Sequence, residues 1–127
     1  MNEREAVDLR PPVWIGHIAL TTDCLSEAYA FMQKLGMRGL MEMENMAILE
    51  LRAGTHLILR QTAEHTPGLA PFDLMVEDLE ATHVALIERG LEPSAIEGGK
   101  IHQSFTVRDP SGHTIKFNSS HASDQPV

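Results

Sequence analysis

Phe105-Thr-Val-Arg-Asp-Pro-Ser-Gly-His-Thr-Ile-Lys-Phe117 is the stretch that decides the fold of this chain. Two short runs prone to form β-strands flank its centre, Arg108 to Gly112, where Pro110 presets φ for a turn and Gly112 accepts a positive φ. The pattern predicts a β-hairpin. This hairpin closes the second copy of an internal repeat.

The repeat has a shift of 54 residues. This shift aligns Gly36 with Gly90 and Leu20 with Leu74, without a gap. Similarity of a chain to itself at one fixed spacing indicates that it is built from repeated structural units. We therefore expect two modules within one chain.

The first copy, residues 13–61, predicts the order βαβββ. Val13–Thr21 is rich in β-branched and large apolar residues, which is typical of a strand. Apolar residues at helical spacing predict a helix over Leu25–Leu35, begun by Asp23 or Ser26 and ended by Gly36. Three further strands are predicted, over residues 37–42, 46–51 and 56–61.

The second copy, residues 71–118, predicts the same order. A strand over Phe72–Val76 precedes a helix over Leu79–Arg89, and Gly90 ends that helix. The closing hairpin takes residues 101–107 and 114–118, with a short strand expected over 91–94. The remaining segments are a lead-in (1–12), a linker (62–70), a glycine-rich loop (97–100) and a mobile tail (119–127).

Composition narrows the class of protein. With 127 residues, of which 43% are hydrophobic, the chain can build one shared core. Its formal net charge of −8 repels nucleic acids and anionic lipid, so neither is expected as a partner. The lone Cys24 cannot form an intrachain disulfide, the N-terminus lacks a signal pattern, and no apolar run reaches about 18 residues. These features predict a soluble cytoplasmic protein.

The order of motifs resembles the vicinal oxygen chelate superfamily. The motifs are a first strand with Gly16-His-Ile-Ala-Leu20, a helix that ends in Leu-Gly36, and Asp109-Pro-Ser-Gly112 before the last strand. The superfamily includes glyoxalase I, extradiol dioxygenases, methylmalonyl-CoA epimerase, fosfomycin-resistance enzymes and bleomycin-resistance proteins. The resemblance covers residues 13–118. It implies an α+β fold in which two βαβββ modules form a curled mixed sheet around a cavity, and it implies a homodimer.

The resemblance also implies where a metal would bind. Metal-dependent members place ligands on the first and last strand of each module, and His17 matches the first of these positions. The repeat puts Pro71 at its counterpart, while the acidic ligand positions fall at Ile58 and Lys116. A divalent ion needs about three or more donors. Ile, Pro and the Lys ammonium provide none. We therefore expect His17 alone to remain as a ligand, with the usual metal site lost and no cofactor bound.

Other donors could still complete a metal site with His17. Glu50 and His56 lie on predicted strands of the same module, and each could face the cavity. The alternative is that both are polar groups at the edge or rim of the sheet. A divalent metal therefore stays open as a second hypothesis.

Charged residues predict a different ligand. Asp73 matches the cavity-side position Ala19 under the repeat, and Arg60 shares a strand face with Ile58. Burying charges on one concave face costs several kcal/mol unless they are paired. An anionic ligand would suit Lys116 and Arg60 as counter-charges with Asp73 as their partner. The alternative is a structural salt bridge at the rim.

Residues outside these sets have simpler interpretations. His102 and His113 are expected to be surface or packing residues, and the methionines of the first module are expected to pack in the core. Cys24 has no histidine beside it in sequence, so it is not predicted to be a nucleophile.

Two functions follow from the resemblance and these residues. The first is a binding protein that holds a small, anionic molecule in the cavity without the family metal, like the bleomycin-resistance proteins. The second is a metal-dependent lyase, isomerase or dioxygenase acting on a small oxygenated metabolite. Whether the protein is an enzyme is left open. A purely structural or partner-binding domain is less favoured, because several polar residues converge on one face.

Overall fold

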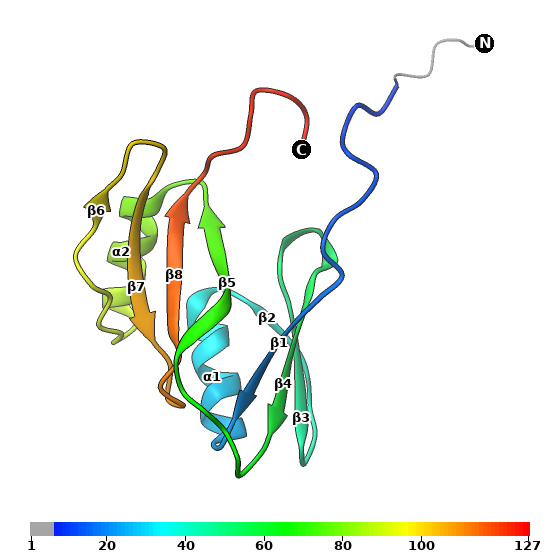
Figure 1. Ribbon diagram of the computed structural model, residues 1–127, viewed down its shortest axis with the longest axis vertical. Coiled ribbons are helices and arrows are strands. Elements are labelled where there is room, and N and C mark those ends of the chain that lie inside the picture. The colour runs from blue at the N-terminus through cyan, green and yellow to red at the C-terminus, as the bar shows by residue number, and fades with distance from the viewer. Residues whose placement is uncertain (1–6) are drawn as a thin grey trace.

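The computed structural model describes residues 7–127, so residues 1–6 of the predicted lead-in lie outside the described chain. Two modules follow one another, each with one helix and four strands (Figure 1). The first contains β1 (His17–Thr22), α1 (Leu25–Leu35), β2 (Arg38–Glu42), β3 (Met46–Glu50), the 3-10 turn η1 (Arg52–Gly54) and β4 (His56–Gln61). The second contains β5 (Leu69–Val76), α2 (Leu79–Glu88), β6 (Glu97–Gly98), β7 (Gln103–Arg108) and β8 (Thr114–Ser119).

Each module forms its own four-stranded sheet, with the orders β1-β4-β3-β2 and β5-β8-β7-β6. In both sheets the first strand runs parallel to the last, and the other pairs are antiparallel. The α+β fold of two βαβββ modules is therefore confirmed. The two sheets stay separate and do not close into a barrel.

The two modules also share a strand register. Ala19 pairs with Ile58 between β1 and β4, and Asp73 pairs with Lys116 between β5 and β8. Ala19 and Asp73 are the positions that the 54-residue repeat equates. The repeat in the sequence is thus a repeat in space.

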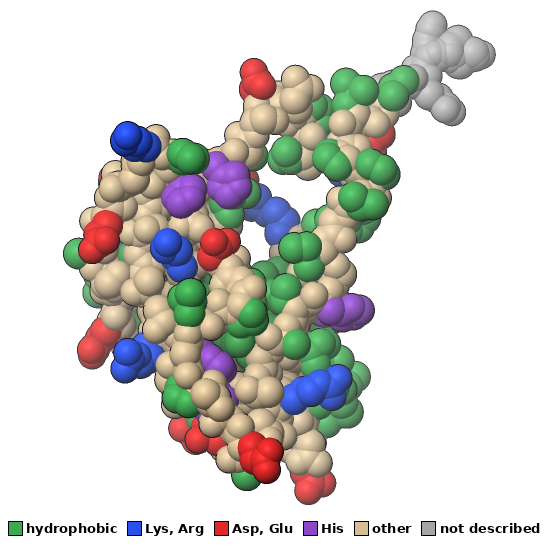
Figure 2. Space-filling model, in the orientation of Figure 1, with side chains coloured by type: hydrophobic (Ala, Val, Ile, Leu, Met, Phe, Trp, Pro, Cys, Tyr) green, Lys and Arg blue, Asp and Glu red, His purple; other side chains and the backbone are tan. Residues whose placement is uncertain are grey.

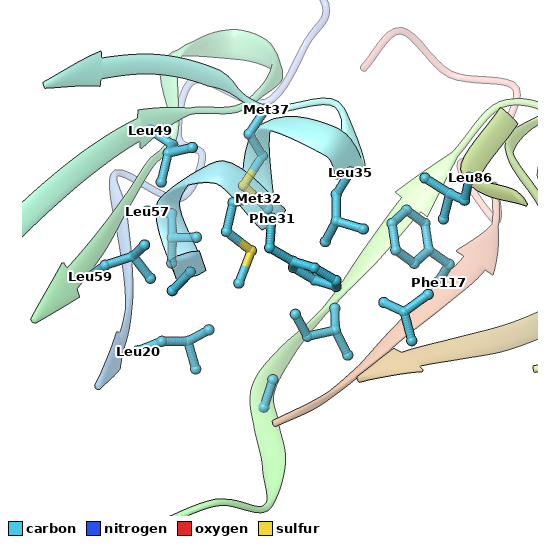
Figure 3. Packing of buried hydrophobic residues seen from close by; sticks show 14 of the residues in the cluster. Leu20, Phe31, Met32, Leu35, Met37, Leu49, Leu57, Leu59, Leu86 and Phe117 are labelled. Atoms are coloured by element: carbon cyan, nitrogen blue, oxygen red, sulfur yellow. The ribbon is translucent and has the colours of Figure 1, made fainter. Parts of the chain in front are cut away.

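A single hydrophobic core joins the modules. Leu57 and Leu49 approach α1 from the first sheet, whereas Leu86 and Phe117 approach it from the second module (Figure 3). All four side chains are buried. The Phe117 ring stacks on Phe105 with 5.0 Å between ring centroids. Because one cluster holds residues from both modules, we expect them to fold as one unit.

The helices begin and end largely as their sequences indicate. Gly36 ends α1 in the left-handed region, with φ 118°, as predicted. The predicted capping by Asp23 or Ser26 is wrong. Cys24 occupies the N-cap without a side-chain bond, and the Gln61 side chain accepts a hydrogen bond from Leu25 N instead (2.9 Å). At 11 and 10 residues, neither helix of the described chain could cross a membrane.

The strand predicted over Val13–Thr21 begins later, at His17. Its first partner in β4 is His56, and the chain before β4 turns through η1. Residues 13–15 therefore find no neighbouring strand, and Trp14 is 66% exposed. An apolar pattern indicated a strand here, but a strand also needs a partner.

The second module differs from its prediction between α2 and β7. No strand forms over residues 91–94, and a two-residue strand, β6, lies inside the predicted glycine-rich loop. Ser94 nevertheless bonds to the edge of β7, because its N–H donates to Thr106 O and its Oγ accepts from Thr106 N (both 2.8 Å). β5 starts at Leu69, within the predicted linker.

Candidate functional site

Each sheet packs one face against the core and leaves the other open. In β1 the side chains alternate as predicted, since Leu20 is buried whereas His17, Ala19 and Thr21 are exposed. Figure 2 shows charged and histidine side chains spread over the strands of the face seen there. These open faces carry the six residues that the sequence predicts for the site: His17, Glu50, His56, Arg60, Asp73 and Lys116.

Three of these residues form a row on the first sheet. His17 pairs with His56, and His56 with Glu50, across the neighbouring strands β1, β4 and β3. The two imidazole rings lie 6.0 Å apart in an edge-on arrangement. Arg38 of β2 extends the row, because it pairs with Glu50. Arg38 was not among the predicted site residues, because only the register between β2 and β3 brings it beside Glu50.

Hydrogen bonds occupy both oxygens of the Glu50 carboxylate. Arg38 donates to one oxygen (2.9 Å), and His56 Nε2 lies 3.3 Å from the other. Glu50 and His56 are half-buried, whereas the Arg38 side chain is exposed. Within residues 7–127, no three His, Cys, Asp or Glu side chains are arranged to hold a metal ion. The row is therefore a hydrogen-bonded charge network.

A pocket of about 380 Å³ lies beside this network. Glu50 and Arg38 line it together with the end of α1 at Gly36 and the η1 turn. Its walls bring Arg52 close as a second guanidinium, although that side chain is paired with Glu77 (3.0 Å). The pocket thus offers arginine donors next to a carboxylate.

Arg60 lies farther along β4, on the same open face as His56 and Ile58. Its neighbours in register are Thr21 and Met46. Its side chain forms no ion pair in the described part of the chain. Arg60 therefore has a guanidinium available to a ligand on this face.

On the second sheet, Asp73 and Lys116 are direct register partners. Both are exposed. The predicted salt bridge between them is not formed among residues 7–127. Thr106 of β7 lies opposite Lys116 on the other side. The Lys116 residue thus has one carboxylate and one hydroxyl residue as its register neighbours, and no ion pair with a described residue neutralises it.

The divalent metal that the family resemblance implies does not fit the residues at the expected ligand positions. Ile58, Pro71 and Lys116 stand where the family ligands would be, and none of these side chains can donate an electron pair to a cation. His17 alone has a suitable nitrogen. A single imidazole does not make a divalent site, which needs about three or more protein donors.

The cleft between the modules lies away from the predicted residues. It has a volume of about 500 Å³ and is lined by both modules, including Leu35, Leu74, Asp78, Ala85 and Phe117. These residues come from the two helices, from the N-cap of α2, and from β5 and β8. None of the six predicted site residues lines this cleft. The six predicted residues therefore lie outside this cleft, on the open faces of the sheets.

A buried polar network, missed from the sequence, joins the last hairpin to β1. Asp109 Oδ1 accepts hydrogen bonds from the N–H groups of Ser111 (3.0 Å) and His113 (2.7 Å). His113 Nε2 donates to Thr21 O (2.8 Å), and the Ser111 and Thr22 hydroxyls lie 2.7 Å apart. All but Thr21 are buried. The turn that dominates the sequence is therefore a joint between the modules.

His65 strengthens this joint from the linker. Its Nε2 donates to Ser111 O (2.7 Å), and its ring lies edge-on to His113 with 4.6 Å between centroids. Cys24 is half-buried, and Thr22 Oγ1 donates to its sulfur (3.6 Å). These contacts position the modules and account for the buried histidine.

No protein-family model and no curated protein sequence matches this chain. Solved structures do match. Lactoylglutathione lyase from Agrobacterium tumefaciens has a TM-score of 0.72 at 17% identity, with 88% of this chain and 97% of that chain covered. A glyoxalase / bleomycin resistance protein from Catenulispora Acidiphila has a TM-score of 0.70 at 25% identity, with 84% and 99% covered.

TnmS3, an antibiotic binding protein from Streptomyces sp. CB03234, has a TM-score of 0.72 at 19% identity, with 84% of this chain and 95% of that chain covered. At such identities these likenesses define the fold. The chain has the fold of the glyoxalase, bleomycin-resistance and dioxygenase structures, which is that of the vicinal oxygen chelate superfamily. The resemblance drawn from the sequence is confirmed to this extent.

Proposed function

We propose that the protein binds a small anionic molecule on the open faces of its sheets, without the metal used by metal-dependent members of the superfamily. The observation that carries this proposal is Lys116. It stands at an acidic ligand position of the family pattern, is exposed on β8, and forms no ion pair within residues 7–127. An ammonium there attracts an anion and repels a metal cation.

Further residues support an anionic ligand. Arg60 offers a guanidinium on the open face of the first sheet, and it forms no ion pair within residues 7–127. The exposed His17 can add a hydrogen bond. The bond from Arg38 keeps Glu50 occupied, which limits its repulsion of the ligand. Asp73 is the opposing charge, and it would orient the Lys116 ammonium.

The relatives are consistent with a binding role. TnmS3 has this fold and is described as an antibiotic binding protein. Lactoylglutathione lyase has the same fold and is named as an enzyme. The fold therefore supports both classes, and the residues at the site decide between them.

The second candidate is a metal-dependent lyase, isomerase or dioxygenase. One observation favours it, namely that His17, His56 and Glu50 lie on three neighbouring strands in one row. Imidazole and carboxylate are the donors that divalent zinc or iron would use. For this, Glu50 would have to exchange its bond to Arg38 for a metal. Isothermal titration of wild type with Zn²⁺ and Mn²⁺ tests it, with micromolar, His17-dependent binding as the supporting result.

We also propose a homodimer that works in the cytoplasm. Val13, Trp14 and Ile15 are apolar and 78%, 66% and 62% exposed. They extend from β1, where a second copy could cover them. Light scattering of wild type and Trp14→Ser tests the dimer, and a monomer at high concentration in both would contradict it. The cytoplasm is where the single Cys24 would stay reduced.

The main experiment uses an anionic aromatic dye, 8-anilinonaphthalene-1-sulfonate, as the probe. Its fluorescence reports binding to a cationic, partly apolar surface. Lys116→Glu should weaken binding by about tenfold or more, since a favourable charge becomes a repulsive one. Lys34→Glu is the matched control, because Lys34 is an exposed lysine in the last turn of α1. Equal losses in both variants would mean that only the net charge matters, and the site would be rejected.

A further inference from the structure

A cluster of soft donors lies at one end of the second sheet, beyond Lys116. Met75 of β5 pairs with Asn118 of β8, and Asn118 pairs with Ser104 of β7. His102 precedes β7 by one residue, and His121 follows the end of β8 by two. Figure 2 shows two histidine side chains together where the C-terminal segment leaves the sheet. No function considered above uses this cluster.

The two imidazoles are spaced as if they shared an ion. The rings of His102 and His121 lie 5.7 Å apart between centroids, tilted by 37°. With metal–nitrogen bonds of about 2.0–2.1 Å, two imidazoles on one metal have ring centres roughly 5 to 6.5 Å apart. The backbone N–H of His121 lies 3.3 Å from the thioether sulfur of Met75. That contact brings a sulfur donor close to the imidazole pair.

Two buried polar atoms of the cluster have no partner. His102 Nδ1 and Asn118 Oδ1 form no hydrogen bond within the described chain, and Asn118 is only 2% exposed. A buried acceptor without a partner costs about 1–3 kcal/mol. In the tautomer with its proton on Nε2, the His102 imidazole has a lone pair on Nδ1, which a bound cation would satisfy.

We propose that His102, His121 and Met75 bind a soft monovalent metal ion, Cu(I) or Ag(I). Thioether sulfur and imidazole nitrogen suit Cu(I), whereas Mg²⁺ and Ca²⁺ require oxygen donors. Neutral donors also match a single positive charge, because no carboxylate is needed to balance it. The site differs from the family metal positions at His17, Ile58 and Lys116. The proposed metal site can therefore be tested independently of the proposed anion site.

Other soft donors in the chain could compete and must be controlled. Cys24 is a half-buried thiol. Met41 is as exposed as Met75, at 47%, on the β2–β3 hairpin. His17 and His56 form another imidazole pair, 6.0 Å apart, but His56 is engaged by Glu50.

The test is an anaerobic titration of untagged Cys24→Ser protein with Cu(I), in competition with bicinchoninate as a chromophoric chelator. One equivalent per chain is expected. His102→Gln and His121→Gln should each weaken binding by about 100-fold or more, since loss of even an outer partner of a metal site costs about 10–100-fold. Met75→Leu should weaken it by about tenfold. The matched controls His17→Gln and Met41→Leu should leave the affinity unchanged.

A second measurement needs no variant of the site. Ag(I) added to the Cys24→Ser protein should shift the NMR signal of the Met75 methyl group and the ring signals of His102 and His121, and leave that of Met41 in place. Absence of stoichiometric Cu(I) binding would overturn the proposal, as would losses in the controls equal to those in the site variants. If Zn²⁺ bound as tightly as Cu(I) and Met75→Leu did not change the metal affinity, the assignment to a soft ion would be overturned. Unchanged dye binding by His102→Gln would confirm that the anion site is separate.

Discussion

The two modules share a topology but differ in the turn before the last strand. In the first module this turn is η1, in which Ala53 adopts a left-handed conformation with φ 64°. In the second module it is the Asp109–Gly112 turn, where a buried carboxylate holds the backbone and Gly112 takes the positive φ. One turn is strained and exposed, and the other is a buried joint. The repeat thus preserves strand order while the stability of each copy has a different source.

The open faces of the two sheets also carry different side chains. The first carries the hydrogen-bonded row of His17, His56 and Glu50, whereas the second carries Asp73 and Lys116. The core side of both modules is mainly apolar and merges into one cluster, with the buried polar network of Thr22, Asp109, Ser111 and His113 at one end of it. Packing therefore restricts the inner face of each module and leaves the outer face free to vary in chemistry.

The largest effect should come from the shared core. Phe117→Ala should lower the free energy of unfolding by about 3–5 kcal/mol, and Leu57→Ala by about 2–5 kcal/mol, because both create buried cavities. Each change should destabilise both modules together. Urea denaturation followed by circular dichroism and by hydrogen exchange of the two modules measures this. If amide protons of one module stayed protected from exchange while the other module unfolded, the modules would not share one cooperative core.

A matched control for these variants is Ile87→Ala. Ile87 lies on α2 and is 52% exposed. Its loss should change the free energy of unfolding by less than about 1 kcal/mol, because a surface position leaves little cavity. A loss as large as that of Phe117→Ala would show that burial does not rank these positions.

The turn of the second module should give the next largest effect. Asp109→Ala removes the acceptor of two buried backbone N–H groups and should cost about 2 kcal/mol or more, at about 1–3 kcal/mol for each unsatisfied group. Asp109→Asn keeps an acceptor oxygen and should cost less. Thermal and urea unfolding of the three proteins would measure the order. If Asp109→Ala were as stable as wild type, the second turn would not be the stabilising joint that distinguishes it from the first turn.

The turn of the first module should respond in the opposite direction. Ala53→Gly relieves a left-handed conformation that costs a non-glycine residue about 1–2 kcal/mol, while it gives up chain entropy of about 0.4–1 kcal/mol. A gain of up to about 1 kcal/mol in the free energy of unfolding is expected. Gly112→Ala is the contrasting change, because a Cβ there would lie 2.9 Å from Pro67 Cβ at a φ of +91°. Gly112→Ala should lower the free energy of unfolding. An increase would contradict the proposed difference between the two turns.

The smallest effect concerns the segment before the first module, which has no counterpart before the second. Hydrogen bonds from Arg10 lower the pKa of Asp8 to about 2, below its usual 3.8. The ion pair between them should therefore persist as the pH falls and be lost only near pH 2. Carboxyl carbon NMR titration of wild type measures the midpoint, and Arg10→Gln should move it back toward 3.8. An unchanged midpoint in Arg10→Gln would refute the pairing.

Local patterns were enough to predict the exact bounds of two elements. The helix Leu25–Leu35 and the strand His56–Gln61 have the predicted bounds. Helical periodicity and a following glycine are properties of neighbouring residues, so they can be read directly along the chain. The start of β1 was misplaced because a strand end depends on where its partner begins, which lies about 40 residues away in sequence.

The candidate site also has features that could be predicted from the sequence and features that could not. Strand alternation correctly placed His17 and Ala19 on the open face. It gave no sign that Arg38 would bond to Glu50, because that contact depends on the register between β2 and β3. The sequence allowed His113 to be a surface or a packing residue, but it did not predict the hydrogen bond from His113 to Thr21 O, because that bond joins two distant segments.

Two features of the structure, the paired βαβββ modules and the helix ends at glycine, could be predicted from the sequence alone. These depend on residue identity, on periodicity and on one fixed repeat length. Only the tertiary structure decided that the sheets stay separate, that the last turn is buried against β1, and that His102, His121 and Met75 meet. Those outcomes depend on contacts between distant segments, whose distances are set by packing rather than by any local pattern.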